Sequence, residues 1–242
     1  MPELIILFII LFIILFFVAT VSAYFKTPQG RGKFGEWQVA RKIGKTIEGE
    51  QYVLNDYIIE ESNKSSQIDH IVINASGVFV IETKNYAGRI YGADNQLEWT
   101  QVLNYGKVKN KFYNPVKQNE THVYRIKQVI KDMPVYSIVI FIQNNTQYVK
   151  SKMILPLKYL KKYLKSGPQL FSKTQMENAY NALLTAQSGM NTKEHVQNIH
   201  RQQQALAMGI CPRCGGRLEK RNSAYGVFYG CSNYPRCTFT KK

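Results

Sequence analysis

The pattern of apolar and polar side chains is most informative between residues 67 and 85, where the sequence reads QIDHIVINASGVFVIETKN. Apolar residues dominate on both sides of a short polar stretch at 74–77, which predicts two strands joined by a turn. If the hairpin pairs symmetrically about this turn, Asp69 on the first strand lies directly opposite Glu82 on the second. Alternate side chains of a strand share a face, so Glu82 and Lys84 project together, about 7 Å apart along the strand. The pattern therefore predicts two carboxylates beside an amine within an apolar hairpin.

Two carboxylates that oppose each other across a hairpin are unfavourable unless another group stabilises them. The Cβ atoms of directly opposed residues lie about 5 Å apart, and like charges in that relation destabilise a sheet. A divalent cation such as Mg²⁺ or Mn²⁺, which prefers oxygen ligands, would hold Asp69 and Glu82 together. The alternative is that both acids lie near strand ends and form a solvated polar rim. The spacing alone leaves both interpretations open.

The longest apolar segment lies near the N-terminus. Residues 4–23 carry no charge and are long enough as a helix to cross about 30 Å of hydrocarbon, so we interpret them as a transmembrane helix. The alternative is a cleaved signal peptide ending at Val21-Ser22-Ala23, but the apolar run exceeds the usual core of about 7–15 residues and only Glu3 precedes it as a charge. Basic residues follow closely, which predicts a single-pass protein of the cell membrane with its bulk on the cytoplasmic side. These residues are Lys26, Arg31, Lys33, Arg41, Lys42 and Lys45.

Residues 24–33 include TPQGRG and predict a short linker, after which residues 34–43 are expected to be helical. Glu36 would share one side of that helix with Ala40 and Ile43, a face that is otherwise apolar. Glu36 could thus be a third acid directed at the hairpin site. An acid in the first turn of a helix is equally well explained by the helix dipole.

A second helix is expected to begin at Pro115, a residue suited to the first turn, and to extend to about residue 130. On it Gln118, His122 and Arg125 fall on one face, which either lines a cleft or is a solvated helix surface. Strands are predicted at residues 51–60, 89–91, 98–100, 135–142 and 153–155.

Three helices are predicted before the C-terminal segment, at residues 157–165, 174–187 and 192–208. The first is basic and amphipathic. The last begins with Asn191 as N-cap and Glu194 three residues later, the pattern of a capping box. His195 and His200 are five residues apart, which does not suit a shared metal face on a helix, so we expect both on the surface.

The chain of 242 residues carries 32 basic and 16 acidic side chains, a net charge of +16, which predicts a polyanionic partner such as nucleic acid or an acidic membrane surface. The excess is uneven. Residues 1–143 hold 16 basic and 13 acidic side chains, residues 144–210 hold 9 and 2, and residues 211–242 hold 7 and 1. A basic surface that grips a polyanion is therefore expected in the C-terminal third.

All four cysteines lie in the last 32 residues, as Cys211-Pro-Arg-Cys214 and, after a spacer of sixteen residues, Cys231-Ser-Asn-Tyr-Pro-Arg-Cys237. Two close pairs with such a spacer are typical of a four-thiolate Zn²⁺ site. The alternative is two disulfides in a secreted chain, against which the predicted cytoplasmic side argues.

Aromatic and basic residues are interleaved around these cysteines, as in proteins that stack unpaired bases and track phosphates. We expect Phe228 and Phe239 in the core of the small C-terminal unit. The candidates for nucleic-acid contact are Arg213, Arg217, Lys220, Arg221, Tyr225, Tyr234 and Arg236.

Residues from about 30 to 130 resemble the nuclease-related domain (NERD) family, through G-E-W at Glu36, Q-I-D at Asp69, E-T-K at 82–84 and Gln118. That family looks like a branch of the restriction-endonuclease-like PD-(D/E)xK superfamily. The resemblance implies an α/β fold with a mixed sheet flanked by helices. It further implies that Asp69 and Glu82 bind Mg²⁺ or Mn²⁺ and that Lys84 positions or activates the attacking water, with Glu36 and Gln118 as further polar site residues.

Cys211 to Thr240, C-P-R-C-G-G…G-C-S-N-Y-P-R-C-T-F, closely resembles the zinc ribbons at the C-terminus of bacterial type I topoisomerases. The expected organisation is a transmembrane helix (4–23), a linker (24–33), a nuclease-related domain (34–156), a basic helical region (157–209) and a four-cysteine zinc ribbon (210–242). The expected function is membrane-anchored, metal-dependent hydrolysis of DNA. The alternative is a membrane-tethered nucleic-acid-binding protein whose nuclease fold is inactive or very narrowly specific.

Overall fold

The computed structural model describes residues 2–61, 64–223 and 226–241 and is a mixed α/β protein, as the sequence predicted. Its helices are α1 (Pro2–Lys26), α2 (Pro28–Ile43), α3 (Pro115–Val129), α4 (Leu160–Leu164), α5 (Lys173–Ala186) and α6 (Thr192–Ala207), with short 3-10 turns at Asn104–Gly106 and Leu157–Tyr159. Its strands are β1 (Gln51–Glu61), β2 (Lys64–Asn74), β3 (Gly77–Lys84), β4 (Arg89–Ala93), β5 (Glu98–Leu103), β6 (Val108–Tyr113), β7 (Val135–Phe141), β8 (Tyr148–Lys150), β9 (Leu218–Ser223), β10 (Gly226–Cys231) and β11 (Thr240–Lys241).

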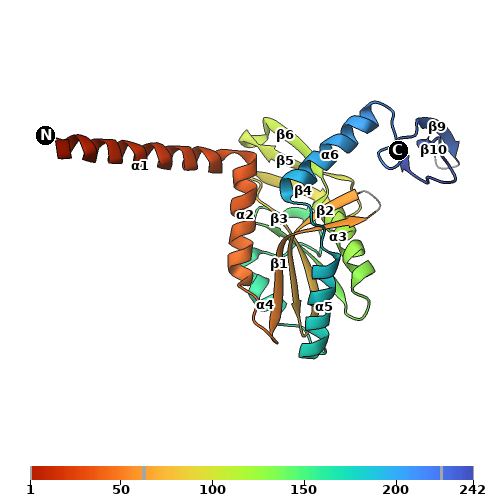
Figure 1. The fold of residues 1–242 in the computed structure, drawn as a ribbon, viewed down its shortest axis with the longest axis horizontal. Helices are drawn as coiled ribbons and strands as arrows, with labels where there is room; N and C mark the ends of the chain where they lie inside the picture. Colours follow the sequence, from red (N-terminus) through yellow and green to blue (C-terminus); the bar gives the residue numbers. More distant parts are fainter. Residues whose placement is uncertain (1, 62–63, 224–225, 242) are drawn as a thin grey trace. The chain divides into compact units, whose positions relative to one another are not determined.

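The chain divides into two compact units, one formed by residues up to 55 with 69–182 and one formed by 56–68 with 183–242. The first unit contains the core of the main sheet, whose strands follow the order β1-β2-β3-β7. Strand β3 is antiparallel to β2 and parallel to β7, so the sheet is mixed. Figure 1 shows α2 and α3 on opposite sides of this sheet.

Both faces of the main sheet are apolar, because its central strands carry apolar residues at successive positions and successive side chains point to opposite sides. On one face β2, β3 and β7 pack against α2 and α4. On the other, Val139 and Phe141 pack against Val116 of α3 and against the second sheet. The apolar cluster on the face covered by α2 and α4 consists of Val39, Ile43, Val72, Phe79, Ile81, Ile138, Ile140, Leu160 and Leu164.

The predicted register of the hairpin is confirmed over residues 70–74 and 77–81, and Asp69 and Glu82 lie just beyond the last pair of this ladder. Ile73 pairs with Val78 and Ile71 pairs with Val80, and the ladder continues to His70 and Ile81. The strands are separated only by residues 75–76, which form the turn. Because the register is fixed, Ile71 and Val80 share the face that α3 covers.

Helix α3 is held on the sheet by a buried amide. Asn119 is fully buried, and its Nδ2 donates to the carbonyls of Val80 at 2.9 Å and Ile138 at 3.1 Å and to the hydroxyl of Ser137 at 2.9 Å. These bonds tie one point of α3 to both β3 and β7. Gln118 and His122, the polar residues of α3 close to Asn119, are thereby held over the end of β3.

A second sheet, with strand order β6-β5-β4-β8, follows the hairpin and includes the strands predicted around residues 90 and 99. Its inner face is built on Trp99, which is fully buried and packs with Ile90 and Phe141. A Cβ at Gly92 would lie only 2.3 Å from the Trp99 ring, so glycine is required there for the ring to pack on β4.

The predicted linker at residues 24–33 is wrong. Helix α1 ends at Lys26, Thr27 is extended, and α2 begins at once with Pro28 in its first turn. The Thr27 side chain caps α2 by accepting from the amide of Gly30 at 3.0 Å. The sequence TPQG therefore combines an N-cap with a first-turn proline, and these residues start a helix.

The second unit comprises the outer ends of β1 and β2, α6 and the C-terminal strands. Within it, the Tyr57 hydroxyl donates to the Leu183 carbonyl at 2.8 Å, and burial raises the pKa of Tyr57 to about 12. The predicted capping box of α6 is confirmed. The prediction that His195 lies on the surface is wrong, because its ring is buried and lies 2.7 Å from the Ser65 hydroxyl; His200 is exposed as expected.

We predict that Asn119→Ala lowers the free energy of unfolding by about 2 kcal/mol, because the buried carbonyls it serves would lose their donor. Urea denaturation followed by circular dichroism measures this loss. Gln128→Ala, at an exposed position of the same helix, is the control and is expected to change stability by less than about 0.5 kcal/mol. Equal effects of the two substitutions would contradict the anchoring role of Asn119.

Candidate functional site

The hairpin brings its three ionisable side chains together near the end of β3. Lys84 Nζ donates to Glu82 Oε1 at 2.6 Å, and the Glu82 side chain is only 2% exposed. Asp69 directly precedes His70, the first residue of β2 that pairs with β3, and its Oδ2 accepts from the amide of Thr83 at 2.7 Å. The three residues predicted from the pattern are therefore neighbours in the fold.

Helix α3 closes this group from above. Gln118 Oε1 accepts from Lys84 Nζ at 3.0 Å, so the ammonium is held between the Glu82 carboxylate and the Gln118 amide. One turn further on, His122 Nε2 lies 3.5 Å from Glu82 Oε2. His122 and Arg125 are both buried. The polar stripe on α3 thus faces the protein interior, and its interpretation as a solvated helix surface is wrong.

His122 is a site residue that the pattern of acids and lysine could not single out. Both of its ring nitrogens lack a hydrogen-bond partner among the described residues, although the side chain is buried beside Glu82. The signal in the sequence was its position four residues after Gln118, which places both on one face of α3.

Burial and mutual charge set the ionisation of the site. Burial, together with the charges of Glu82 and Glu36, raises the pKa of Asp69 well above its ordinary value. Burial also opposes the ionisation of Glu82, but Lys84 and His122 outweigh it and lower the pKa of Glu82. For Lys84, the two carboxylates outweigh burial and raise its pKa, so the amine is held as an ammonium.

These residues fit a divalent cation. Glu82 Oε2 is buried and makes no hydrogen bond within the described part of the chain; His122 Nε2 faces it at 3.5 Å, a long contact that leaves the oxygen able to take a further ligand. Asp69 carries a carboxylate whose ionisation is disfavoured by a like charge, a situation that a bound cation reverses. Carboxylate oxygens are the ligands that Mg²⁺ and Mn²⁺ prefer.

Glu36 lies at the margin of the site. On α2 the buried positions are Gly30, Gly35, Val39 and Ile43, whereas Glu36 is partly exposed and bonded to Lys33 at 2.7 Å. Its charge nevertheless contributes to the raised pKa of Asp69. Glu36 therefore acts on the site through its field and makes no direct contact with Asp69 in this structure.

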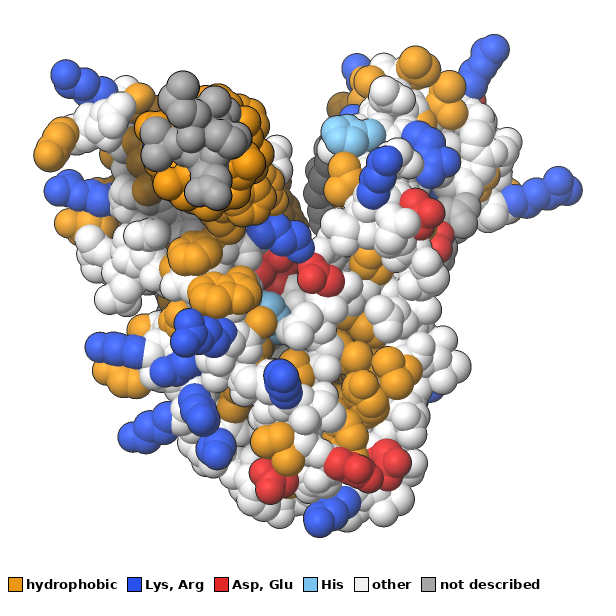
Figure 2. Space-filling model, turned by 60° about the vertical axis from the view of Figure 1, so that its left-hand side comes forward, with side chains coloured by type: hydrophobic (Ala, Val, Ile, Leu, Met, Phe, Trp, Pro, Cys, Tyr) orange, Lys and Arg blue, Asp and Glu red, His pale blue; other side chains and the backbone are white. Residues whose placement is uncertain are grey.

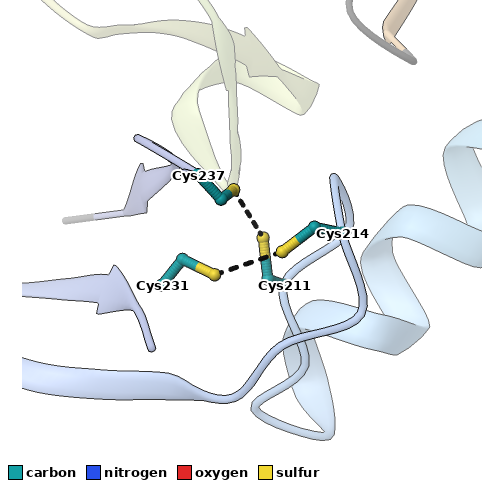
Figure 3. Close-up of side chains that lie close together, drawn as sticks. All are labelled: Cys211, Cys214, Cys231 and Cys237. Carbon is teal, nitrogen blue, oxygen red and sulfur yellow. Dashed lines mark hydrogen bonds between the residues drawn. The ribbon is translucent and has the colours of Figure 1, made fainter. Parts of the chain in front are cut away.

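The four cysteines form a second site, in the other unit. The sulfur atoms of Cys211, Cys214, Cys231 and Cys237 all lie within 4.8 Å of one another. Figure 3 shows these four side chains pointing toward a common centre. The Sγ atoms of Cys211 and Cys237 are 3.8 Å apart and those of Cys214 and Cys231 are 3.3 Å apart. A tetrahedron with Zn–S bonds of about 2.3 Å has edges of about 3.8 Å, so the cluster has the size of a four-cysteine zinc site.

The thiols differ strongly in acidity. A hydrogen bond from the Gly216 amide, with smaller contributions, lowers the pKa of Cys214 to about 6, whereas burial raises the pKa of Cys231 to about 12. Four thiolates would not form together here unaided, and Zn²⁺ supplies the charge that stabilises them. No disulfide joins the cysteines.

The zinc-site cysteines are also the core of the ribbon. Cys211, Cys231 and Cys237 are buried together with Phe239, as predicted for Phe239, while Phe228 is only partly buried. With so few apolar residues, this unit is of the kind that depends on its metal for folding.

The predicted contact residues of the ribbon fall into two groups. Arg217, Lys220, Tyr234 and Arg236 are exposed, and Tyr234 is 63% exposed. Arg213 and Arg221 are partly buried and bond within the ribbon, to Thr238 at 3.2 Å and to the Cys231 carbonyl at 3.0 Å. Tyr225 lies outside the described residues.

Comparison with known proteins agrees with this architecture. Residues 31–142 match the nuclease-related domain family, and residues 208–242 match the topoisomerase DNA-binding C4 zinc finger. The chain thus combines a nuclease-related fold with a nucleic-acid type of zinc ribbon. An uncharacterised protein of Bacillus anthracis is 33% identical over 183 residues, which are 72% of this chain and 85% of that relative. The chain belongs to the nuclease-related domain family.

The ribbon is similar to a small part of much longer enzymes. DNA topoisomerase 1 of Methanocaldococcus jannaschii is 56% identical over 32 residues, 13% of this chain and 4% of the enzyme. DNA topoisomerase 1 of Archaeoglobus fulgidus is 62% identical over 34 residues, 14% of this chain and 5% of the enzyme. No solved structure matches the chain.

We predict one tightly bound zinc per chain. Elemental analysis of the purified protein should find it in the wild type and lose it in Cys237→Ser, because three sulfurs do not complete a structural zinc site. Ser223→Ala, in the same unit but away from the cysteines, should keep the metal. Full zinc content in Cys237→Ser would contradict a site built from all four cysteines.

Proposed function

We propose that this protein is a membrane-anchored, metal-dependent nuclease that hydrolyses DNA phosphodiester bonds. The observation that carries the proposal is the group of Asp69, Glu82 and Lys84, in which two acids and an ammonium share one end of an apolar sheet, with Glu82 buried and Asp69 and Lys84 partly buried. A polar cluster of this kind is costly for stability, so a catalytic role is the best explanation for its presence.

Asp69 and Glu82 are the residues that would hold Mg²⁺ or Mn²⁺. When bound, such an ion neutralises charge on the phosphate and lowers the pKa of coordinated water. Lys84 supplies a fixed positive charge beside the attacked phosphate, because its neighbours keep it protonated. Gln118 and Glu82 hold the Lys84 ammonium in place, and Asn119 fixes the helix that carries Gln118.

The zinc ribbon is proposed to bind the nucleic acid substrate. Its exposed cations, Arg217, Lys220 and Arg236, provide charge for the phosphates, and Tyr234 provides an exposed ring for an unpaired base. Similarity to the DNA-binding zinc finger of topoisomerases supports this assignment.

Anchoring by α1 is the third part of the proposal. Within the described residues, Ile6–Lys26 is the one helix long and apolar enough to cross a membrane, with a mean hydropathy of 3.1 and none of its span buried. Aromatic and basic side chains follow on α2, where Phe34 and Trp37 stack at 5.7 Å and Arg41 lies 5.4 Å from the centre of the Trp37 ring. Such residues are favoured at the interface between lipid and water. Figure 2 shows basic and hydrophobic side chains side by side on the face below α1.

We predict that the full-length protein in detergent cleaves DNA when Mg²⁺ or Mn²⁺ is added, and that Lys84→Ala lowers the rate at least about a hundredfold by removing the fixed charge. A screen of duplex, single-stranded and branched DNA and of RNA measures this and identifies the substrate form. Lys131→Ala, an exposed lysine of the same unit, is the control and should cut normally. No cleavage of any substrate, or equal cleavage by wild type and Lys84→Ala, would leave the tethered binding protein as the better account.

For the anchor, we predict that the protein stays in the membrane fraction after an alkaline wash and is released when Leu11 and Ile14 are both replaced by lysine, since charges in mid-span oppose insertion. Protease added outside spheroplasts should leave the ribbon intact. A chain that starts at Tyr24 and is recovered in the medium would identify residues 1–23 as a cleaved signal peptide.

A further inference from the structure

The outer face of the second sheet carries a set of side chains that the nuclease site and the zinc ribbon leave unused. On the inner face of this sheet Ile90 and Trp99 are buried and Phe112 is partly buried, and the outer face is composed of the residues that alternate with these three. On β4, β5, β6 and β8 these residues are Arg89, Tyr91, Ala93, Glu98, Thr100, Val102, Lys109, Lys111, Tyr113, Tyr148 and Lys150.

Two tyrosines at the β4–β8 edge of this face form a stacked pair. Tyr91 on β4 is paired in register with Tyr148 on the edge strand β8, and their rings are 4.8 Å apart and inclined by 9°. Both remain solvent-accessible, at 37% and 47% exposure. On the other side, Tyr91 is in register with the small residue Thr100, so the tyrosine has no bulky neighbour there.

Hollows flank the tyrosine pair. One, of about 660 Å³, is lined by Tyr91, Thr100, Arg89 and Lys109, and a second, of about 620 Å³, is lined by Tyr91, Tyr148, Lys111 and Lys150 among others. Tyr91 and Thr100 border both, so the two hollows adjoin across the sheet. Each has room for a planar ring beside the tyrosines and a cation at its rim.

The charge of this face is positive. Four basic side chains, Arg89, Lys109, Lys111 and Lys150, stand against one acid, Glu98, which lies 3.7 Å from Lys111. A sheet that displays stacked aromatics between cations suits a strand of unpaired nucleotides, whose bases stack on rings while its phosphates meet the cations. A duplex, whose bases are already stacked, would gain nothing from the tyrosines.

We propose that the outer face of the β6-β5-β4-β8 sheet is a binding site for single-stranded nucleic acid, with Tyr91 and Tyr148 as the stacking platform and Arg89, Lys109, Lys111 and Lys150 as phosphate contacts. The site deepens the proposed function, because it identifies single-stranded nucleic acid as a ligand of the nuclease-related domain itself. It rests on the proposed function only in assuming that the polyanionic partner is nucleic acid.

The test uses the full-length, zinc-loaded protein in detergent without added Mg²⁺, and an oligothymidylate that carries 5-iodouracil. Irradiation should crosslink the oligonucleotide to Tyr91 or Tyr148, identified by mass spectrometry of the peptides. Fluorescence anisotropy should show that Tyr91→Ala/Tyr148→Ala weakens binding at least about tenfold, because stacking on the rings is lost. Tyr91→Phe/Tyr148→Phe keeps the rings and should bind as the wild type does.

Matched controls separate this site from the rest of the molecule. Tyr159→Ala removes an equally exposed tyrosine elsewhere in the same unit and should leave affinity unchanged. Lys84→Ala should lose cleavage and still bind the oligonucleotide as the wild type does. A wild-type protein that binds the oligonucleotide through Tyr91 and Tyr148 but cleaves no substrate would count against the proposed nuclease and not against this site. The assignment would be overturned if crosslinks were confined to the ribbon or if Tyr91→Ala/Tyr148→Ala kept the wild-type affinity for the oligonucleotide. It would also be overturned if this variant lost as much affinity for a DNA duplex and for anionic vesicles as for the single strand.

Discussion

The central constraint on this structure is the cost of keeping charged groups in the core of a sheet. Glu82 is 2% exposed and lies on a strand whose other residues are almost all buried and apolar. A carboxylate in such a place is tolerated only when it is paired and hydrogen-bonded. Lys84, at 2.6 Å, supplies the pairing, and Gln118 holds Lys84 in turn.

The rest of the nuclease-related domain is arranged around that pairing. The hairpin register brings Asp69 to the same end of the sheet, and the side-chain bond from Asn119 fixes α3 so that Gln118 and His122 close over Glu82. Burial strengthens every electrostatic interaction in this group, which is what makes the arrangement costly for folding and useful for chemistry on an anionic substrate.

Much of this could be predicted from the sequence because the responsible patterns are local. The apolar runs on either side of the short polar stretch at 74–77 fix the hairpin register, and Pro115 and Asn191 mark the helix starts. Predictions failed where tertiary contacts decide. The sequence of α6 alone predicts that His195 lies on the surface. Its burial is explained by its contact with Ser65, 130 positions away in the chain. In the same way, the sequence pattern of Gln118 and His122 is compatible with a solvated helix face, and only their contacts with Lys84 and Glu82 of β3 show that they face the protein interior.

The central claim is that Asp69 and Glu82 together bind a catalytic divalent cation. Isothermal titration of the zinc-loaded protein with Mn²⁺ tests it most directly, with Asp69→Asn and Glu82→Gln as the variants. We expect one saturable Mn²⁺ site in the wild type, abolished or strongly weakened in each variant while the zinc content stays constant. Absence of a saturable site in the wild type, or unchanged Mn²⁺ affinity in both variants, would contradict the account.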